Sequence, residues 1–140
     1  MNSPSAKGRV TVGEFFSGLF AALAEQGHRQ IYRCGGRFNE AVEAAFKTFR
    51  EGIAKQGLKP SFLIILHPFY GDAEAIEQGL IASVTRDLIS HLNPSFEQFQ
   101  LNLAPEEAGE ILETLPGGAD VYRALAEKFF EHYSQEKTLA

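Results

Sequence analysis

The most informative stretch of this sequence runs Pro60-Ser61-Phe62-Leu63-Ile64-Ile65-Leu66-His67-Pro68. Five successive apolar residues stand between two proline-containing breaks, a run that is short for a helix and typical of a strand. A strand that is apolar at every position has both faces buried, as central strands of parallel sheets do. We therefore predict a central, buried β-strand over Ser61–Leu66.

Two weaker strands are predicted elsewhere in the chain. Gln30–Cys34 is a short extended stretch that ends at a glycine pair. Phe96–Leu103 alternates apolar and polar residues, which is typical of a strand with one solvated face. Helical patterns separate the three strands, so we expect parallel pairing through right-handed crossovers. The same residues would also be compatible with an antiparallel third strand.

Helical spacing of apolar residues predicts about five helices. The first follows a capping box at Thr11-Val12-Gly13-Glu14 and ends before Gly27. The others are expected over about Phe38–Gln56, over about Ala73–Leu92 with Asp72 as the cap, from Pro105, and over about Ala119–Tyr133. Together with the strands they predict a small three-layer α/β/α sandwich around a short, mostly parallel three-stranded sheet.

Length and composition fit one globular domain. The chain has 140 residues, of which 44% are hydrophobic. Residues 1–10 are expected to be a flexible lead-in, residues 11–134 a single α/β domain, and residues 135–140 a frayed tail. The net charge of −5 argues against binding to nucleic acid or to an anionic membrane, since both favour a basic face.

The cysteine count and the hydropathy indicate the cellular compartment of the protein. Cys34 is the only cysteine, so no disulfide can form within the chain, and a reducing compartment is expected. The apolar run Phe62–Leu66 is far shorter than the roughly 20 residues that span a bilayer. We expect a cytoplasmic protein that makes no membrane contact.

In open parallel sheets, sites lie beyond the carboxyl ends of the strands. Those ends would bring together Cys34, His67 and Asp72. One hypothesis makes Cys34 a nucleophile that His67 activates, with Asp72 or Glu106 orienting the imidazole. The alternative is that Cys34 is a small buried residue and that His67 makes one backbone hydrogen bond.

The same loops could hold a small anionic ligand. Gly35 and Gly36 precede Arg37 at the start of a helix, where backbone N–H groups favour negative charge. Tyr70 would supply a further donor, and Glu106 lies at the end of the third strand. Neither dinucleotide-binding nor Walker glycine motifs are present, and plain turn chemistry also explains the glycine pair.

Other side chains are assigned more simply. His28, His91 and His132 form no ligand pair with one another, so no metal site and no cofactor are expected. Five phenylalanines on the first and last predicted helices are assigned to the core, or to a partner surface if nothing in the chain covers them. They are Phe15, Phe16, Phe20, Phe129 and Phe130.

Because no catalytic motif is complete, we expect a non-catalytic ligand-binding or protein-interaction module that is oligomeric, most simply a homodimer. The alternative is a small enzyme that acts on a phosphorylated or acyl substrate near Cys34 and His67. An accessible Cys34 of low pKa in a cleft would favour the enzyme, and a large apolar interface would favour the module.

Overall fold

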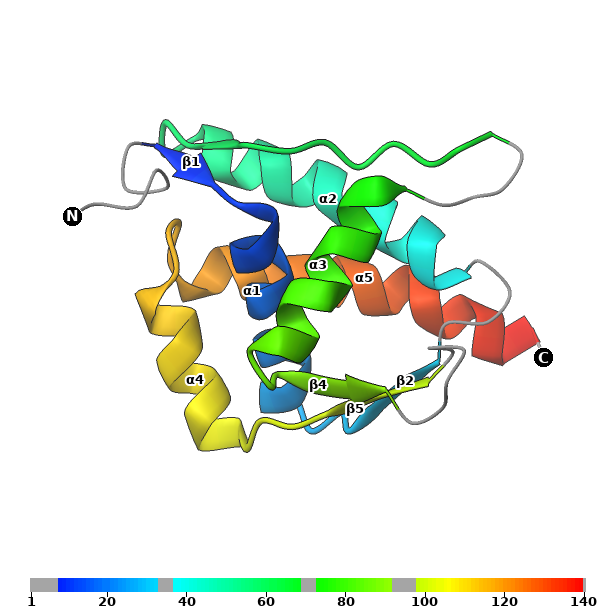
Figure 1. Cartoon of the computed structure of the whole chain (residues 1–140). Helices are drawn as coiled ribbons and strands as arrows, with labels where there is room; N and C mark the ends of the chain where they lie inside the picture. The colour runs from blue at the N-terminus through cyan, green and yellow to red at the C-terminus, as the bar shows by residue number, and fades with distance from the viewer. Residues whose placement is uncertain (1–7, 33–36, 69–72, 92–97, 140) are drawn as a thin grey trace.

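The computed structural model describes residues 8–32, 37–68, 73–91 and 98–139, which form five helices and two small sheets (Figure 1). The helices are α1 (Val12–Glu25), α2 (Arg37–Ala54), α3 (Glu74–Thr85), α4 (Pro105–Thr114) and α5 (Ala119–Leu139). The strands are β1 (Arg9–Val10), β2 (Gln30–Tyr32), β3 (Lys59–Pro60), β4 (Ile89–His91) and β5 (Gln98–Leu101). Within these ranges, no helix has the length and apolar character needed to cross a membrane.

The prediction of a parallel three-stranded sheet is wrong. The larger sheet has the order β2-β5-β4 and both of its pairings are antiparallel, with Ile31 opposite Phe99 and His91 opposite the same residue. A separate two-stranded sheet pairs β1 with β3 in parallel, at the other end of the molecule (Figure 1). Antiparallel pairing of β4 with β5 needs only a short connection, whereas parallel pairing needs a long crossover.

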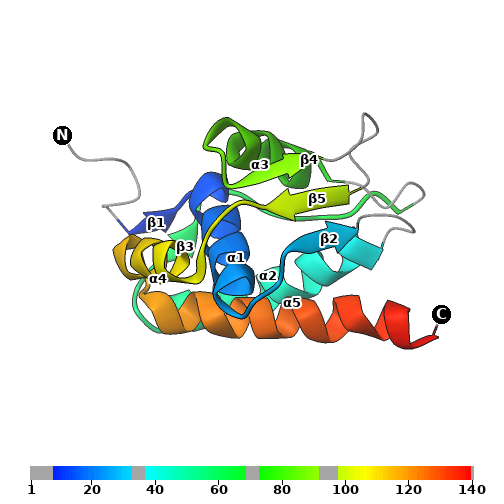
Figure 2. The same cartoon turned by 90° about the horizontal axis from the view of Figure 1, so that it is seen from below.

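A helix, and not the sheet, occupies the centre of the fold. α1 lies between α3 and α5 (Figure 2), and every residue from Phe15 to Ala24 is buried. Its predicted capping box is confirmed: the Glu14 N–H donates to the Thr11 hydroxyl at 3.1 Å, and the Thr11 N–H donates to the Glu14 carboxylate at 2.9 Å. A helix that is apolar all round must be covered all round, which explains why the layers predicted from the sequence do not form.

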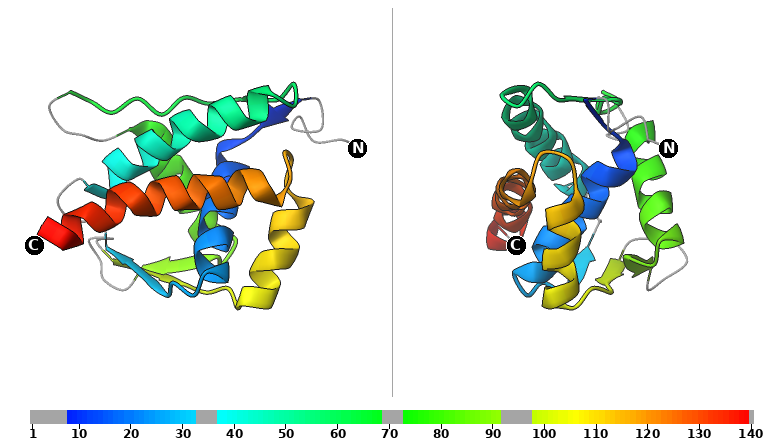
Figure 3. Two further views of the ribbon diagram at one scale, coloured as in Figure 1. Left: turned by 180° about the vertical axis from the view of Figure 1, so that it is seen from behind. Right: turned by 90° about the vertical axis from the view of Figure 1, so that its left-hand side faces the viewer.

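The core is largely aromatic. α2 and α5 pack side by side in opposite directions (Figure 3), and Phe38 of α2 makes an edge contact with Phe129 of α5 at 5.6 Å between ring centroids. Phe99 of β5 packs against both Phe38 and Phe20 of α1. The chain itself therefore buries four of the five aromatic residues that were candidates for a partner surface, namely Phe15, Phe16, Phe20 and Phe129.

The third helix is shorter than predicted. α3 ends at Thr85, its N-cap is Ala73 instead of Asp72, and the apolar residues Leu88 and Ile89 lie in and beside β4. Asp87 has a φ of 62°, and the Leu88 N–H donates to the Ser83 carbonyl at 2.9 Å. This is the hydrogen-bond pattern that closes a helix when one residue adopts the left-handed conformation. The prediction was too long because the apolar residues keep helical spacing across the turn at Asp87.

The predicted central strand over Ser61–Leu66 is also wrong. After β3 the chain continues as an extended trace along the outside of the molecule, beside α2 (Figures 1 and 3). Only alternate side chains point inward, so the stretch is buried on one face and not on two. We call residues 61–68 the extended segment.

Candidate functional site

The extended segment exposes large apolar side chains in a regular alternation. Ile64 is 4% exposed, whereas Leu63 is 57% and Ile65 69% exposed. On the inner face, the Phe62 ring packs against Phe15 and Phe46, with centroids 5.5 and 5.3 Å away. The inner residues therefore hold the segment on the core while the outer residues face solvent. Leu63 and Ile65 are two of only four exposed large hydrophobic residues in the described part of the chain.

The backbone of this segment is open to pairing. The Lys59 N–H donates to the Gly8 carbonyl and the Ser61 N–H donates to the Val10 carbonyl, both at 2.9 Å. The ladder then stops, because Thr11 leaves it to cap α1. Among the described residues no backbone hydrogen bond reaches residues 62–65, and the Leu66 N–H meets only the Glu43 carboxylate, at 3.5 Å. Unpaired extended backbone of this kind can accept a further strand.

The two ends of the extended segment differ in charge. At its start, a cleft of about 360 Å³ is lined by Arg50 and Lys59, and the exposed side chain of Arg9 lies on the neighbouring strand. At its far end, a cleft of about 470 Å³ lies between Ile65–Pro68 and the start of α3, and is lined by Glu74 and Glu77. The segment is therefore basic at its start and acidic at its end.

The described residues bring only part of the predicted site into view. Cys34, Gly35, Gly36, Tyr70 and Asp72 lie outside the described residues, and so do the contacts that they make. His67 is exposed at the end of the extended segment and lines the cleft with Glu74 and Glu77. These two carboxylates oppose an anionic ligand in that cleft, because like charges repel.

Arg37 and Glu106 do not meet. Arg37 is the first residue of α2 and forms an ion pair with Glu40 at 3.8 Å, and Glu106 is exposed in the first turn of α4. The two helices begin at opposite ends of the molecule (Figures 1 and 2). The cause is the antiparallel pairing of β2 with β5, which puts their carboxyl ends at opposite edges of the sheet.

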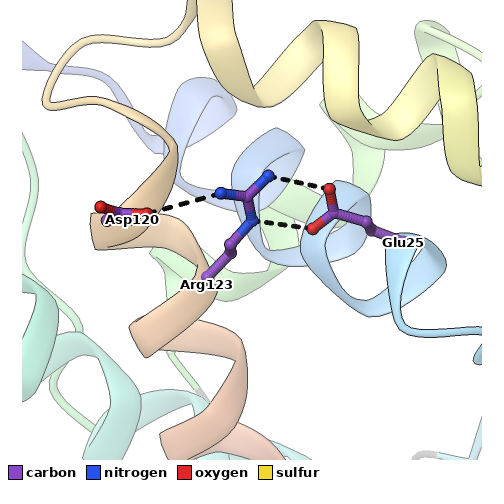
Figure 4. Close-up of polar contacts among 3 residues, drawn as sticks. All are labelled: Glu25, Asp120 and Arg123. Atoms are coloured by element: carbon purple, nitrogen blue, oxygen red, sulfur yellow. Dashed lines mark hydrogen bonds and ion pairs between the residues drawn. The ribbon is translucent and has the colours of Figure 1, made fainter.

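The best-formed polar cluster joins two helices. The Arg123 guanidinium of α5 donates two hydrogen bonds of 2.9 Å to the Glu25 carboxylate at the end of α1, and it lies 3.4 Å from Asp120 (Figure 4). The hydrogen bonds from Arg123 lower the pKa of Glu25 below its usual value. All three groups satisfy one another on the surface, so the cluster holds α1 against α5 and offers no unpaired group for chemistry.

The buried phenol of Tyr122 is likewise occupied. Its hydroxyl donates to the Pro116 carbonyl at 2.6 Å, and burial raises its pKa. In the described ranges, no group of three or more His, Cys, Asp and Glu side chains is placed to bind a metal ion. Among the described residues, the extended segment combines two exposed apolar side chains, Leu63 and Ile65, with unpaired backbone.

Sequence reasoning missed the exposure of Leu63 and Ile65. Proline lacks an N–H donor, and within sheets it is confined to edge strands, to the first residue of a strand and to bulges. Pro60 and Pro68 lie outside the apolar run, where a central strand also allows proline, so they did not distinguish an edge from a centre.

Comparisons with protein-family models, with curated proteins and with solved structures returned no significant match for this chain. The assignment of a function therefore rests on the geometry of the extended segment.

Proposed function

We propose that this protein is a non-catalytic protein-interaction module that binds an extended chain of a partner along residues 61–68. The observation that carries the proposal is the combination of two exposed apolar side chains, Leu63 and Ile65, with unpaired backbone at residues 62–65. Main-chain hydrogen bonds to an added strand supply affinity, and alternate side chains supply specificity.

Anchoring of the inner face supports this role. Phe62 and Ile64 are held in the core, so the segment is positioned before a partner arrives. A preordered segment loses less conformational entropy on binding than a flexible one. An open apolar edge makes a protein prone to aggregation. A protein that retains such an edge is therefore expected to bind a partner there.

The experiment uses a soluble peptide of alternating threonine and valine with one lysine and one glutamate at its ends. Amide chemical shifts of the ¹⁵N-labelled chain are recorded as the peptide is added. We expect shifts concentrated at residues 62–66, and their loss in the Leu63→Ser, Ile65→Ser double variant. Tyr32→Ser is the matched control, because Tyr32 is 49% exposed on β2, away from the segment. Shifts confined to other elements would contradict the proposal.

Replacing Cys34 distinguishes the enzyme hypothesis from the interaction-module hypothesis. A thiol-dependent enzyme needs Cys34, whereas strand addition at residues 62–66 does not. We expect the Cys34→Ser variant to bind the peptide as the unmodified chain does. Loss of peptide binding in Cys34→Ser, with an unchanged circular dichroism spectrum, would instead favour a site built around Cys34.

A further inference from the structure

We infer that the partner of the extended segment is a second copy of this chain, with the two segments antiparallel across a two-fold axis near Ile64. This inference rests on the proposed function and names the occupant of the same surface. Three independent features of the segment carry it: the polarity of its charges, the match of its side chains and the length of its open backbone.

The charges favour self-pairing in one direction only. Arg9, Arg50 and Lys59 are exposed at the start of the segment, and Glu43, Glu74 and Glu77 lie at its end. About seven extended residues separate the two ends, roughly 20 Å, which is more than twice the Debye length of about 8 Å at physiological salt. Each end therefore acts as a separate charged patch.

An antiparallel dimer places each basic patch against the acidic patch of the other copy, twice by symmetry. A parallel arrangement would place like charges together at both ends and is disfavoured. Lys47 and Glu51, also exposed on α2, carry one charge of each sign and leave this polarity unchanged. The surface is thus complementary to itself.

The side chains match in the same register. With the axis at Ile64, Leu63 of one copy stands beside Ile65 of the other, and the reverse pair forms at the symmetric position. Apolar residues that face each other across antiparallel strands stabilise the pairing. The unpaired backbone, residues 62–65, includes the axis position and both members of the Leu63–Ile65 pair. Each of the two exposed apolar side chains gains an apolar neighbour across this single contact.

The first measurement is sedimentation velocity over a range of concentrations up to about 100 µM. We expect a monomer–dimer equilibrium whose dissociation constant rises about tenfold or more in the Leu63→Ser, Ile65→Ser double variant. Tyr32→Ser should leave the equilibrium unchanged. Loss of the dimer in Tyr32→Ser would place the contact on β2 and overturn the inference.

The second measurement tests the direction of pairing. The Arg9→Glu, Lys59→Glu variant has two acidic patches, and the Glu74→Lys, Glu77→Lys variant has two basic ones. Each alone should stay monomeric, and an equimolar mixture should form a heterodimer. For the unmodified chain, raising NaCl from about 50 mM to about 500 mM should weaken the dimer by roughly tenfold. A dimer that salt strengthens, or charge variants that dimerise alone, would overturn the antiparallel arrangement.

The outcome separates this inference from the proposed function. A chain that stays monomeric at about 100 µM, while the threonine–valine peptide still shifts residues 62–66, would overturn the second copy as partner and leave the interaction module standing. A monomeric chain whose segment also ignores the peptide would contradict both. Circular dichroism checks that each charge variant is folded. A variant in which a substitution disturbs β1 or β3 is left out of the comparison, and the other variant still tests the arrangement.

Discussion

The aromatic ring of Tyr122 lies directly against the backbone of Gly18, so closely that a methyl group built on Gly18 would overlap the ring. This contact sets the distance between α1 and α5, and the Arg123–Glu25 pair closes the same helix interface at its surface. Phe16 fills the space beside Gly79 of α3 in the same way. Small residues on the central and outer helices thus allow large rings to enter the core.

The Gly18→Ala substitution should lower the free energy of unfolding by about 1–3 kcal/mol, because the added methyl overpacks the contact with Tyr122. Gly52→Ala is the matched control, since Gly52 also lies in a helix and a methyl there meets no atom within 4 Å. The control should be neutral or stabilising by up to about 1 kcal/mol, as alanine favours helix. Urea unfolding measures both. A Gly18→Ala variant as stable as Gly52→Ala would refute the close packing.

The Ile64→Asp substitution should cost several kcal/mol, because it buries an unpaired carboxylate. Ile65→Asp, one residue further along, should change the free energy of unfolding by no more than about 0.5 kcal/mol, because the side chain is exposed. Thermal melting of both variants at low protein concentration, where self-association does not contribute, makes the comparison. Equal losses would show that Ile65 is buried, as the sequence-based prediction of a two-sided strand requires.

Removing the cap of α1 should destabilise the fold. Thr11→Ala leaves the Glu14 N–H without its side-chain acceptor and should cost about 1 kcal/mol. Thr11→Ser keeps the hydroxyl and should retain most of the stability. Guanidinium unfolding of the three proteins gives the comparison. If serine fares no better than alanine at this position, the hydroxyl is not the stabilising group.

The Glu25–Arg123 pair should make stability depend on pH. The folded state lowers the pKa of Glu25, so the pair stabilises the fold at pH values above the usual carboxyl range of about 4.5, and this contribution disappears as the pH falls through the lowered pKa. Glu25→Gln should therefore melt at a lower temperature than the unmodified protein at pH 7, and the difference should vanish in acid.

Glu127→Gln is the control for that titration. Glu127 is exposed on α5 and has no ion pair among the described residues, so its replacement should leave the melting temperature nearly unchanged at both pH values. A Glu25→Gln deficit that persists in acid would point to lost packing instead of a lost ion pair.

Helix positions followed from short-range signals in the sequence. The Thr11–Glu14 capping box, Pro105 at the first turn of α4 and the start of α5 at Ala119 all agree with the structure. Residues 98–103, the described part of the predicted strand Phe96–Leu103, also have one buried face, as the alternation predicts, with Phe99, Leu101 and Leu103 inward. Each of these features depends on residues within a few positions of one another, so the sequence pattern contains the whole interaction.

The candidate site could not be predicted in the same way. The strand-end cluster required three parallel strands, and the pairing of β2 with β5 is antiparallel. The unpaired backbone at residues 62–65 depends on where β1 ends, since Thr11 turns into α1 instead of extending the ladder. No pattern within residues 61–68 reports that choice, which is made some fifty residues earlier in the chain.

The capping box of α1 and the starts of α4 and α5 are therefore properties of the sequence alone, because their hydrogen bonds close within one or two turns. The end of α3 is not, because the turn at Asp87 interrupts an apolar pattern that continues beyond it. Strand pairing and the burial of an apolar run are decided only in the tertiary structure. Their free energy comes from contacts between distant residues, such as Val10 with Ser61 and Phe62 with Phe15. The same apolar run is buried on both faces only when packed layers cover both of them, and its backbone edge is open when the neighbouring strand ends early.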